Sequence, residues 1–168
     1  VGGKPLDEVD FIETSHNEYR DGYVLPFGDS PYPIDIDHVA ETVYLDCISR
    51  AEKYLYITTP YLIVDTNITE ALKTAVKRGV DVRIIIPDVP DKKAVYLLTK
   101  STCKNLCEAG VKIYAFRDGF IHSKTVLADG EIAIVGTANF DFRSLVHHFE
   151  CATLLCNTQS INDIYKDF

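Results

Sequence analysis

Residues 120–139 read FIHSKTVLADGEIAIVGTAN, and this stretch predicts a β-hairpin. Two apolar runs flank Asp129-Gly130, a pair that readily adopts the positive φ angles that both central residues of a type I′ turn require. A two-residue turn pairs Ala128 with Glu131. The sequence therefore predicts two antiparallel strands and the register between them.

This register gathers polar side chains at the open end of the hairpin. It sets His122 opposite Thr137 and Lys124 opposite Val135, and Asn139 lies on the same face because strand side chains alternate. Each residue alone is typical of a solvated sheet edge. Together they suit attack on a phosphodiester, because the ammonium, amide and hydroxyl groups can hold the nonbridging oxygens and the imidazole can attack or protonate.

The spacing of these residues resembles the HKD signature of the phospholipase D superfamily. His122-x-Lys124 is followed by Asp129 and then by Gly136-Thr137-x-Asn139 without a gap. The resemblance implies a two-step displacement, in which the histidine of one motif attacks phosphorus and that of a second motif protonates the leaving group and then activates the acceptor. It implies no metal and no cofactor, since two lysines and two asparagines stabilise the charge.

Three further residues complete the set of candidates. Asp129 belongs to the motif and is counted with the catalytic residues, although the family aspartate is mostly structural and the turn lies several residues from His122. Glu150 matches the family glutamate that hydrogen-bonds a catalytic histidine and fixes its tautomer, the alternative being an ordinary strand carboxylate. Tyr61 follows a predicted strand at the end where α/β proteins bind ligands, so it joins Thr137 as a substrate-binding candidate, with packing alone as the alternative.

Alternating strand and helix patterns predict an α/β fold. Helices are expected at about 36–52, 68–78, 91–109, 141–146 and 161–168, and strands at about 54–59, 80–86, 111–116 and 149–155, besides the hairpin. Residues 21–31 are expected to form a short strand that runs into a turn-rich loop. The continuous apolar run at 80–86 predicts a strand covered on both faces. We expect a mixed, mostly parallel β-sheet flanked by helices on both faces, forming a phospholipase D-like half-domain over residues 21–168 after a linker over residues 1–20.

The composition limits the function further. The chain has 168 residues, 46% of them hydrophobic, and a formal net charge of −8, which disfavours nonspecific binding to nucleic acid. No apolar run is long enough to span a membrane. The five cysteines include no CxxC pair, and we expect reduced, buried thiols rather than a metal site. Since the chain contains no Met and stops within a helical pattern, we expect a piece of a longer polypeptide.

Several stretches outside the motif resemble the second catalytic half of bacterial cardiolipin synthases, namely residues 21–31, 56–61, 78–84, 119–122, 136–144 and 149–150. This resemblance implies a phosphatidyltransferase of phospholipid biosynthesis that moves a phosphatidyl group between two phosphatidylglycerol molecules. It implies that His122 is the acid/base partner, although the motif is the same in both halves and the nucleophilic role stays open. The parent chain would contact the cell membrane with this domain on the cytoplasmic face, the fragment itself being soluble.

One motif is half of the active site that the family requires. We therefore expect a partner, either a second HKD half in the parent chain or a second copy of this chain in a homodimer. The alternatives are a single-motif phosphodiesterase or nuclease that acts as a homodimer, and a folded half-domain that is inactive alone.

Overall fold

The computed structural model describes residues 22–31, 38–89 and 93–168. The predicted linker over residues 1–20 lies outside them, as do the first residues of two expected helices. Among the described residues, no helix is both long enough and apolar enough to cross a bilayer.

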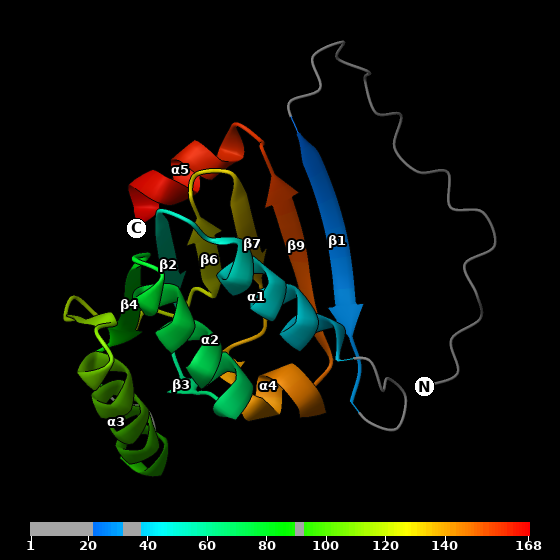
Figure 1. The fold of residues 1–168 in the computed structure, drawn as a ribbon. Helices are drawn as coiled ribbons and strands as arrows, with labels where there is room; N and C mark the ends of the chain where they lie inside the picture. The colour runs from blue at the N-terminus through cyan, green and yellow to red at the C-terminus, as the bar shows by residue number, and fades with distance from the viewer. Residues whose placement is uncertain (1–21, 32–37, 90–92) are drawn as a thin grey trace, which may run out of the picture.

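A seven-stranded sheet forms the centre of the fold, in the order β1-β9-β7-β6-β2-β4-β5 (Figure 1). Its strands are β1 (Tyr23–Asp29), β2 (Tyr54–Thr58), β4 (Asp81–Pro87), β5 (Lys112–Phe116), β6 (Thr125–Ala128), β7 (Ile132–Gly136) and β9 (Glu150–Cys156). A small second sheet, which the sequence did not predict, pairs β3 (Leu62–Ile63) with β8 (Phe140–Asp141). The helices are α1 (Val39–Arg50), α2 (Thr66–Lys77), α3 (Lys93–Glu108), α4 (Phe142–His147) and α5 (Ser160–Asp167).

The α/β class and the mixed sheet are confirmed, but the expectation of a mostly parallel sheet is wrong. In the large sheet only β2, β4 and β5 run parallel to one another, joined through the crossover helices α2 and α3. The other four pairs of that sheet are antiparallel. Parallel neighbours need a long crossover, and the tight turn between β6 and β7 makes that pair antiparallel.

Helices cover both faces of the sheet, as expected, but unequally. α1 and α2 enclose the main core, whose fully buried members include Tyr44, Ile48, Leu55, Ile57, Leu72, Ile84 and Ile134. On the other face α5 packs Ile161 against Tyr56, Leu127 and Ala133. Because α5 has only eight residues, β4 is not covered on both faces as predicted: Val82, Ile84 and Ile86 are buried, while Arg83 and Ile85 are partly exposed.

The hairpin turn forms as predicted. Asp129 and Gly130 have φ angles of 57° and 75°, and the N–H of Glu131 donates to the carbonyl of Ala128 over 3.0 Å. The predicted pairing of Ala128 with Glu131 is wrong, however, because Ala128 pairs with Ile132. The register is therefore shifted by one residue.

The shift follows from a contact with the end of β9. The carbonyl of Glu131 accepts from the N–H of Asn157 over 2.7 Å, so Glu131 pairs outside the hairpin. As a result, Val135 pairs with Thr125 and lies on the opposite face from Lys124. Lys124 lies opposite Gly136, whose N–H donates to the Lys124 carbonyl over 3.2 Å.

The five cysteines are free thiols, but only Cys47 is buried. Burial raises the pKa of Cys47 to about 12, with a smaller contribution from Asp46. Cys107 and Cys151 are exposed, so the expectation of buried thiols is wrong for them.

Candidate active site

The candidate site lies at the end of the sheet where β2 and β4 finish and β6 begins, the lower end in Figure 1. His122 and Lys124 are not in a strand. They precede β6 in an irregular segment that ends at Thr125, so the predicted strand begins later than expected.

His122 and Lys124 are in direct contact. The Lys124 Nζ atom lies 3.0 Å from His122 Nδ1 and 3.1 Å from Nε2, and it donates to the His122 carbonyl over 2.7 Å. The His122 side chain is exposed, whereas Lys124 is partly buried. Because an ammonium group only donates hydrogen bonds, the ring nitrogen that faces it accepts. An accessible imidazole and a cation thus share one small region of the surface.

Glu150 and Thr137 form a second pair. The Glu150 side chain is only 10% exposed, and its Oε2 accepts a short hydrogen bond from the Thr137 hydroxyl. Thr137 Oγ1 also accepts from the N–H of Cys151 over 3.0 Å. Glu150 Oε1 lies 3.5 Å from Nδ1 of His148. The carboxylate predicted to orient a catalytic histidine therefore contacts Thr137 and His148 rather than the His122 ring.

The charge of Glu150 links the two pairs. Burial lowers the pKa of Lys124, and Glu150 opposes this by favouring the charged ammonium group. Glu150 also acts on Tyr44, whose pKa is raised, mainly by burial and then by this carboxylate. The Tyr44 hydroxyl lies 3.5 Å from the carbonyl of Ala138. Tyr44 thus forms part of the buried floor below the site.

Asn139 is held by the start of α4. Its Nδ2 donates to Ser144 Oγ over 3.0 Å, and the N–H of Ser144 donates to Asp141 Oδ1, the N-terminal cap of that helix. Asn139 Oδ1 is buried and has no partner among the described residues. A buried unpaired oxygen costs about 1–3 kcal/mol, and such groups are found where a ligand completes the hydrogen bonding.

Tyr61 is connected to His122 through the ring of Phe120. Its ring centroid lies 6.5 Å from that of Phe120, which lies 5.9 Å from that of His122. The carbonyl of Tyr61 accepts from the hydroxyl of Thr59 over 2.9 Å, which fixes the backbone where β2 ends. Tyr61 therefore lies at the edge of the site.

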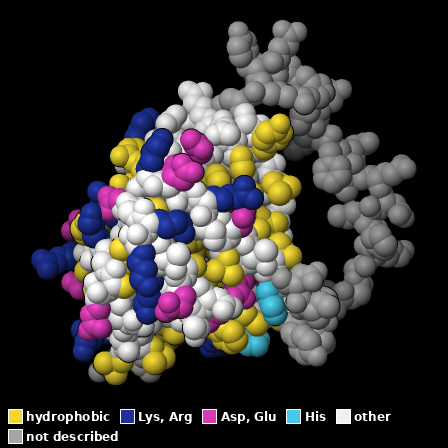
Figure 2. Space-filling model, viewed as in Figure 1, with side chains coloured by type: hydrophobic (Ala, Val, Ile, Leu, Met, Phe, Trp, Pro, Cys, Tyr) yellow, Lys and Arg dark blue, Asp and Glu magenta, His cyan; other side chains and the backbone are white. Residues whose placement is uncertain are grey.

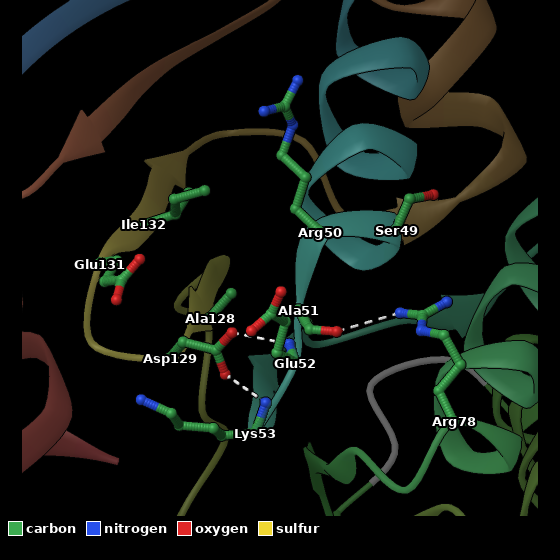
Figure 3. Close-up of a pocket in the computed structure, with 10 residues that line it drawn as sticks. All are labelled: Ser49, Arg50, Ala51, Glu52, Lys53, Arg78, Ala128, Asp129, Glu131 and Ile132. Atoms are coloured by element: carbon green, nitrogen blue, oxygen red, sulfur yellow. Dashed lines mark hydrogen bonds between the residues drawn. The ribbon is translucent and has the colours of Figure 1, made fainter.

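Asp129 lies at the opposite end of the hairpin. Its carboxylate accepts from the backbone N–H groups of Glu52 and Lys53 over 2.7 and 2.8 Å (Figure 3). It also accepts from the N–H of Tyr54 over 2.8 Å and so fixes the start of β2. A pocket of about 730 Å³ also opens there, and Arg78 at its edge donates to the carbonyl of Ala51. This pocket contains no histidine, so its volume does not mark the candidate site.

Within the part of the chain that the structure describes, no group of histidine, cysteine and carboxylate side chains is arranged to hold a metal ion. The polar groups of the site are instead two imidazoles, one ammonium group, the Glu150 carboxylate, one amide and the hydroxyls of Thr137 and Ser144. This set can bind an anion and exchange protons with it.

Sequence reasoning missed three residues of the site. Ser144 could have been found, because Asp141-x-x-Ser144 has the spacing of a helix cap. His148 is two residues before Glu150, so an extended backbone puts both side chains on one side. No local signal pointed to Tyr44, which approaches from α1 and packs edge-on against Phe140 at 5.0 Å between ring centroids.

Comparison with protein families gives one clear match. The family described as "Cardiolipin synthase, PLD-like domain" matches residues 44–168. The chain is 50% identical over 153 residues to an uncharacterized protein of Streptococcus mutans, covering 91% of the chain and 33% of that protein. It is 42% identical to a cardiolipin synthase of Geobacillus kaustophilus and 43% identical to cardiolipin synthase 2 of Bacillus anthracis, over 77% and 79% of the chain. The chain spans about a quarter of the length of these two synthases, 26% of each.

Solved structures share the fold. The phospholipase D family member Nuc from Salmonella typhimurium superposes with a TM-score of 0.68 at 20% identity, over 85% of this chain and 91% of its own. The phosphatidylserine synthase of Haemophilus influenzae gives 0.68 at 19% identity, over 86% of this chain and 38% of its own. At this level of identity the likeness concerns the fold alone.

Proposed function

Because this chain belongs to the family of cardiolipin synthase, phospholipase D-like domains, we propose that it is one catalytic half of a phosphatidyltransferase. The contact between the exposed His122 imidazole and the Lys124 ammonium group, next to the charge of Glu150, carries the proposal. A phosphodiester at this position meets a cation for its nonbridging oxygens and an imidazole for bond formation or proton transfer.

The proposed reaction has two steps and needs two imidazoles. In the first, one imidazole nitrogen bonds to phosphorus as the bond to glycerol breaks, and the other imidazole donates a proton to the leaving glycerol oxygen. In the second, that imidazole removes a proton from the hydroxyl of another phosphatidylglycerol, whose oxygen displaces the histidine. Cardiolipin and glycerol are the products, and no metal enters the balance.

His122 supplies one of these two imidazoles, and Lys124 stabilises the charge that develops on the phosphoryl oxygens. Asn139, held by Ser144, provides a fixed amide beside them. The Thr137 hydroxyl already donates to Glu150, so its contribution is to hold this carboxylate. The second imidazole comes from another HKD half, in the same polypeptide or in a second copy of the chain.

The test uses phosphatidylglycerol labelled in its phosphate and a protein that carries this chain together with a second HKD half. Wild-type protein releases glycerol, and His122→Ala stops the release. If His122 is the acid/base, the variant still forms an acid-labile labelled phosphohistidine; if it is the nucleophile, no labelled protein forms. His147→Ala is the matched control, because His147 is equally exposed and its ring contacts Phe142 rather than this site.

A second candidate is a phosphodiesterase built from two copies of this chain. The single HKD motif of this chain favours it, because a second copy would supply the second imidazole. Gel filtration and an activity assay together separate the two candidates. A dimer that hydrolyses phosphodiesters without transferring phosphatidyl groups supports the two-copy phosphodiesterase. A monomer without activity identifies a half-domain that needs a different partner.

A further inference from the structure

Helix α3 exposes apolar and basic side chains together. Leu97 and Leu98 are 68% and 56% exposed to solvent. Lys100 and Lys104 follow Leu97 by three and seven residues, so they share its face of the helix, and both are exposed. α3 contains three lysines and a single acidic residue, Glu108 at its end, in a chain whose net charge is −8.

These side chains continue toward the candidate site. Val89, Tyr96 and Phe120 line a small cleft together with Tyr61, which brings the first turn of α3 next to the site. Val89 and Phe120 are exposed, and the Phe120 ring lies 5.9 Å from the His122 ring. In Figure 2 hydrophobic side chains reach the surface along the lower edge of the molecule, with Lys and Arg side chains beside them.

We propose that the exposed side of α3, with Leu97 at its centre, Lys100 and Lys104 beside it, Leu98 at its edge and Phe120 next to the helix, binds an anionic lipid bilayer; it is called here the α3 face. The inference rests on the proposed function and deepens it, since it says how a lipid headgroup reaches His122. Helices that lie in the interface of a bilayer combine an exposed apolar face with lysines. Each basic residue near an anionic bilayer strengthens binding about fivefold, and apolar side chains enter below the headgroups.

Charge favours the bilayer over a second copy of the chain as the occupant of the α3 face. A two-fold axis through this face would bring Lys100 and Lys104 against the same residues of the other copy, and like charges across an interface cost affinity. Two acidic residues lie near this face: Asp88 is 3.8 Å from Arg117, and Glu108 is 4.0 Å from Lys104. Both contacts join exposed side chains and are weak, so Lys100 and Lys104 remain charges that an anionic surface can attract.

The test is co-sedimentation of the chain with vesicles of phosphatidylcholine containing phosphatidylglycerol, or of phosphatidylcholine alone. The wild type binds the first and not the second, and added salt weakens the binding. Lys100→Gln with Lys104→Gln lowers the vesicle affinity on the order of tenfold, and Leu97→Ser with Leu98→Ser has a similar effect. All four side chains are exposed, so circular dichroism and the melting temperature stay close to wild type.

The matched controls make the same kinds of substitution at exposed residues outside α3. Lys53→Gln with Lys77→Gln removes two exposed lysines, and Val24→Ser with Leu25→Ser alters residues that are 61% and 58% exposed on β1. Both control pairs retain vesicle binding. The proposal is overturned if the wild type ignores the anionic vesicles, if the control pairs lose as much as the α3 pairs, or if the leucine pair instead abolishes a dimer seen by sedimentation velocity.

Docking and chemistry fail separately. His122→Ala binds vesicles like the wild type, whereas glycerol release from phosphatidylglycerol in detergent micelles depends on His122 and not on the α3 lysines. If the wild-type protein releases glycerol in micelles but does not bind the anionic vesicles, the transferase proposal stands and the α3 face proposal is overturned. If the wild-type protein binds the vesicles but releases no glycerol in micelles, the transferase proposal is overturned.

Discussion

The two ends of one hairpin contrast sharply in this protein. At the turn, both carboxylate oxygens of Asp129 accept backbone N–H groups, three in all, at 2.7–2.8 Å. At the open end, His122 is exposed, Asn139 Oδ1 is buried without a described partner, and burial lowers the pKa of Lys124. Polar groups that are fully paired stabilise a fold, whereas groups left unpaired are available to a ligand. The hydrogen bonds of Asp129 thus stabilise the fold at the turn, and the proposed chemistry belongs to the open end.

The largest effect expected is on activity, at the open end. His122→Asn lowers phosphatidyl transfer on the order of 10³-fold, because the second imidazole of the described site, that of His148, contacts Glu150 and not Lys124. The free energy of unfolding changes by less than about 0.5 kcal/mol, since the side chain is exposed. Glycerol release and urea unfolding measure the two quantities. A large loss of stability would contradict the assignment of this end to chemistry.

The largest effect on stability is expected at the turn. Asp129→Ala removes the acceptor of three N–H groups and destabilises the fold by about 2–3 kcal/mol. The loss is smaller than for three buried groups, because two of these N–H groups are near solvent and can bond to water. Asp129→Asn is the control, because asparagine tolerates the positive φ of this position and keeps one acceptor oxygen. Urea unfolding should order the proteins as wild type, Asn, Ala. Equal stability of all three would break the comparison.

A substitution at Gly136 tests whether close packing at the open end also contributes to stability. A Cβ atom there would lie 2.4 Å from Ala152 Cβ and 2.6 Å from the Cys151 carbonyl, so the backbones of β7 and β9 must move apart. Gly136→Ala should cost about 2 kcal/mol. Gly130→Ala should cost only about 1 kcal/mol, because its strain comes mainly from a φ of 75°. The reverse order in thermal unfolding would contradict this account.

The smallest effect expected is a shift in pH dependence. Burial lowers the pKa of Lys124 below its usual value, and the charge of Glu150 opposes the shift. Removing this charge with Glu150→Gln lowers the pKa of Lys124 further, so the alkaline limb of the activity profile moves to lower pH. Activity at neutral pH falls about tenfold, since Thr137 loses its charged partner. An alkaline limb that stays in place or moves upward would show that Glu150 does not act on Lys124.

How far the site could be predicted differs from residue to residue. The spacing from His122 to Asn139 identified the family, and the family match over residues 44–168 confirms it. That Glu150 orients a catalytic histidine came from the family likeness and stays a prediction, while within this chain the carboxylate contacts Thr137 and His148. Which side chains contact each other across strands depends on tertiary packing, and a local sequence pattern does not predict it.

The sequence by itself determined the turn and most of the elements. Asp129 and Gly130 adopt the positive φ angles that their chemistry allows, and helices and strands follow the apolar periodicity, because both depend on neighbouring residues only. The register and the strand directions were decided by the tertiary structure. Glu131 pairs with Asn157, and the hairpin register is shifted by one residue. Four of the six strand pairs of the large sheet are antiparallel. In both cases hydrogen bonds between distant segments, rather than local preferences, choose among pairings of similar energy.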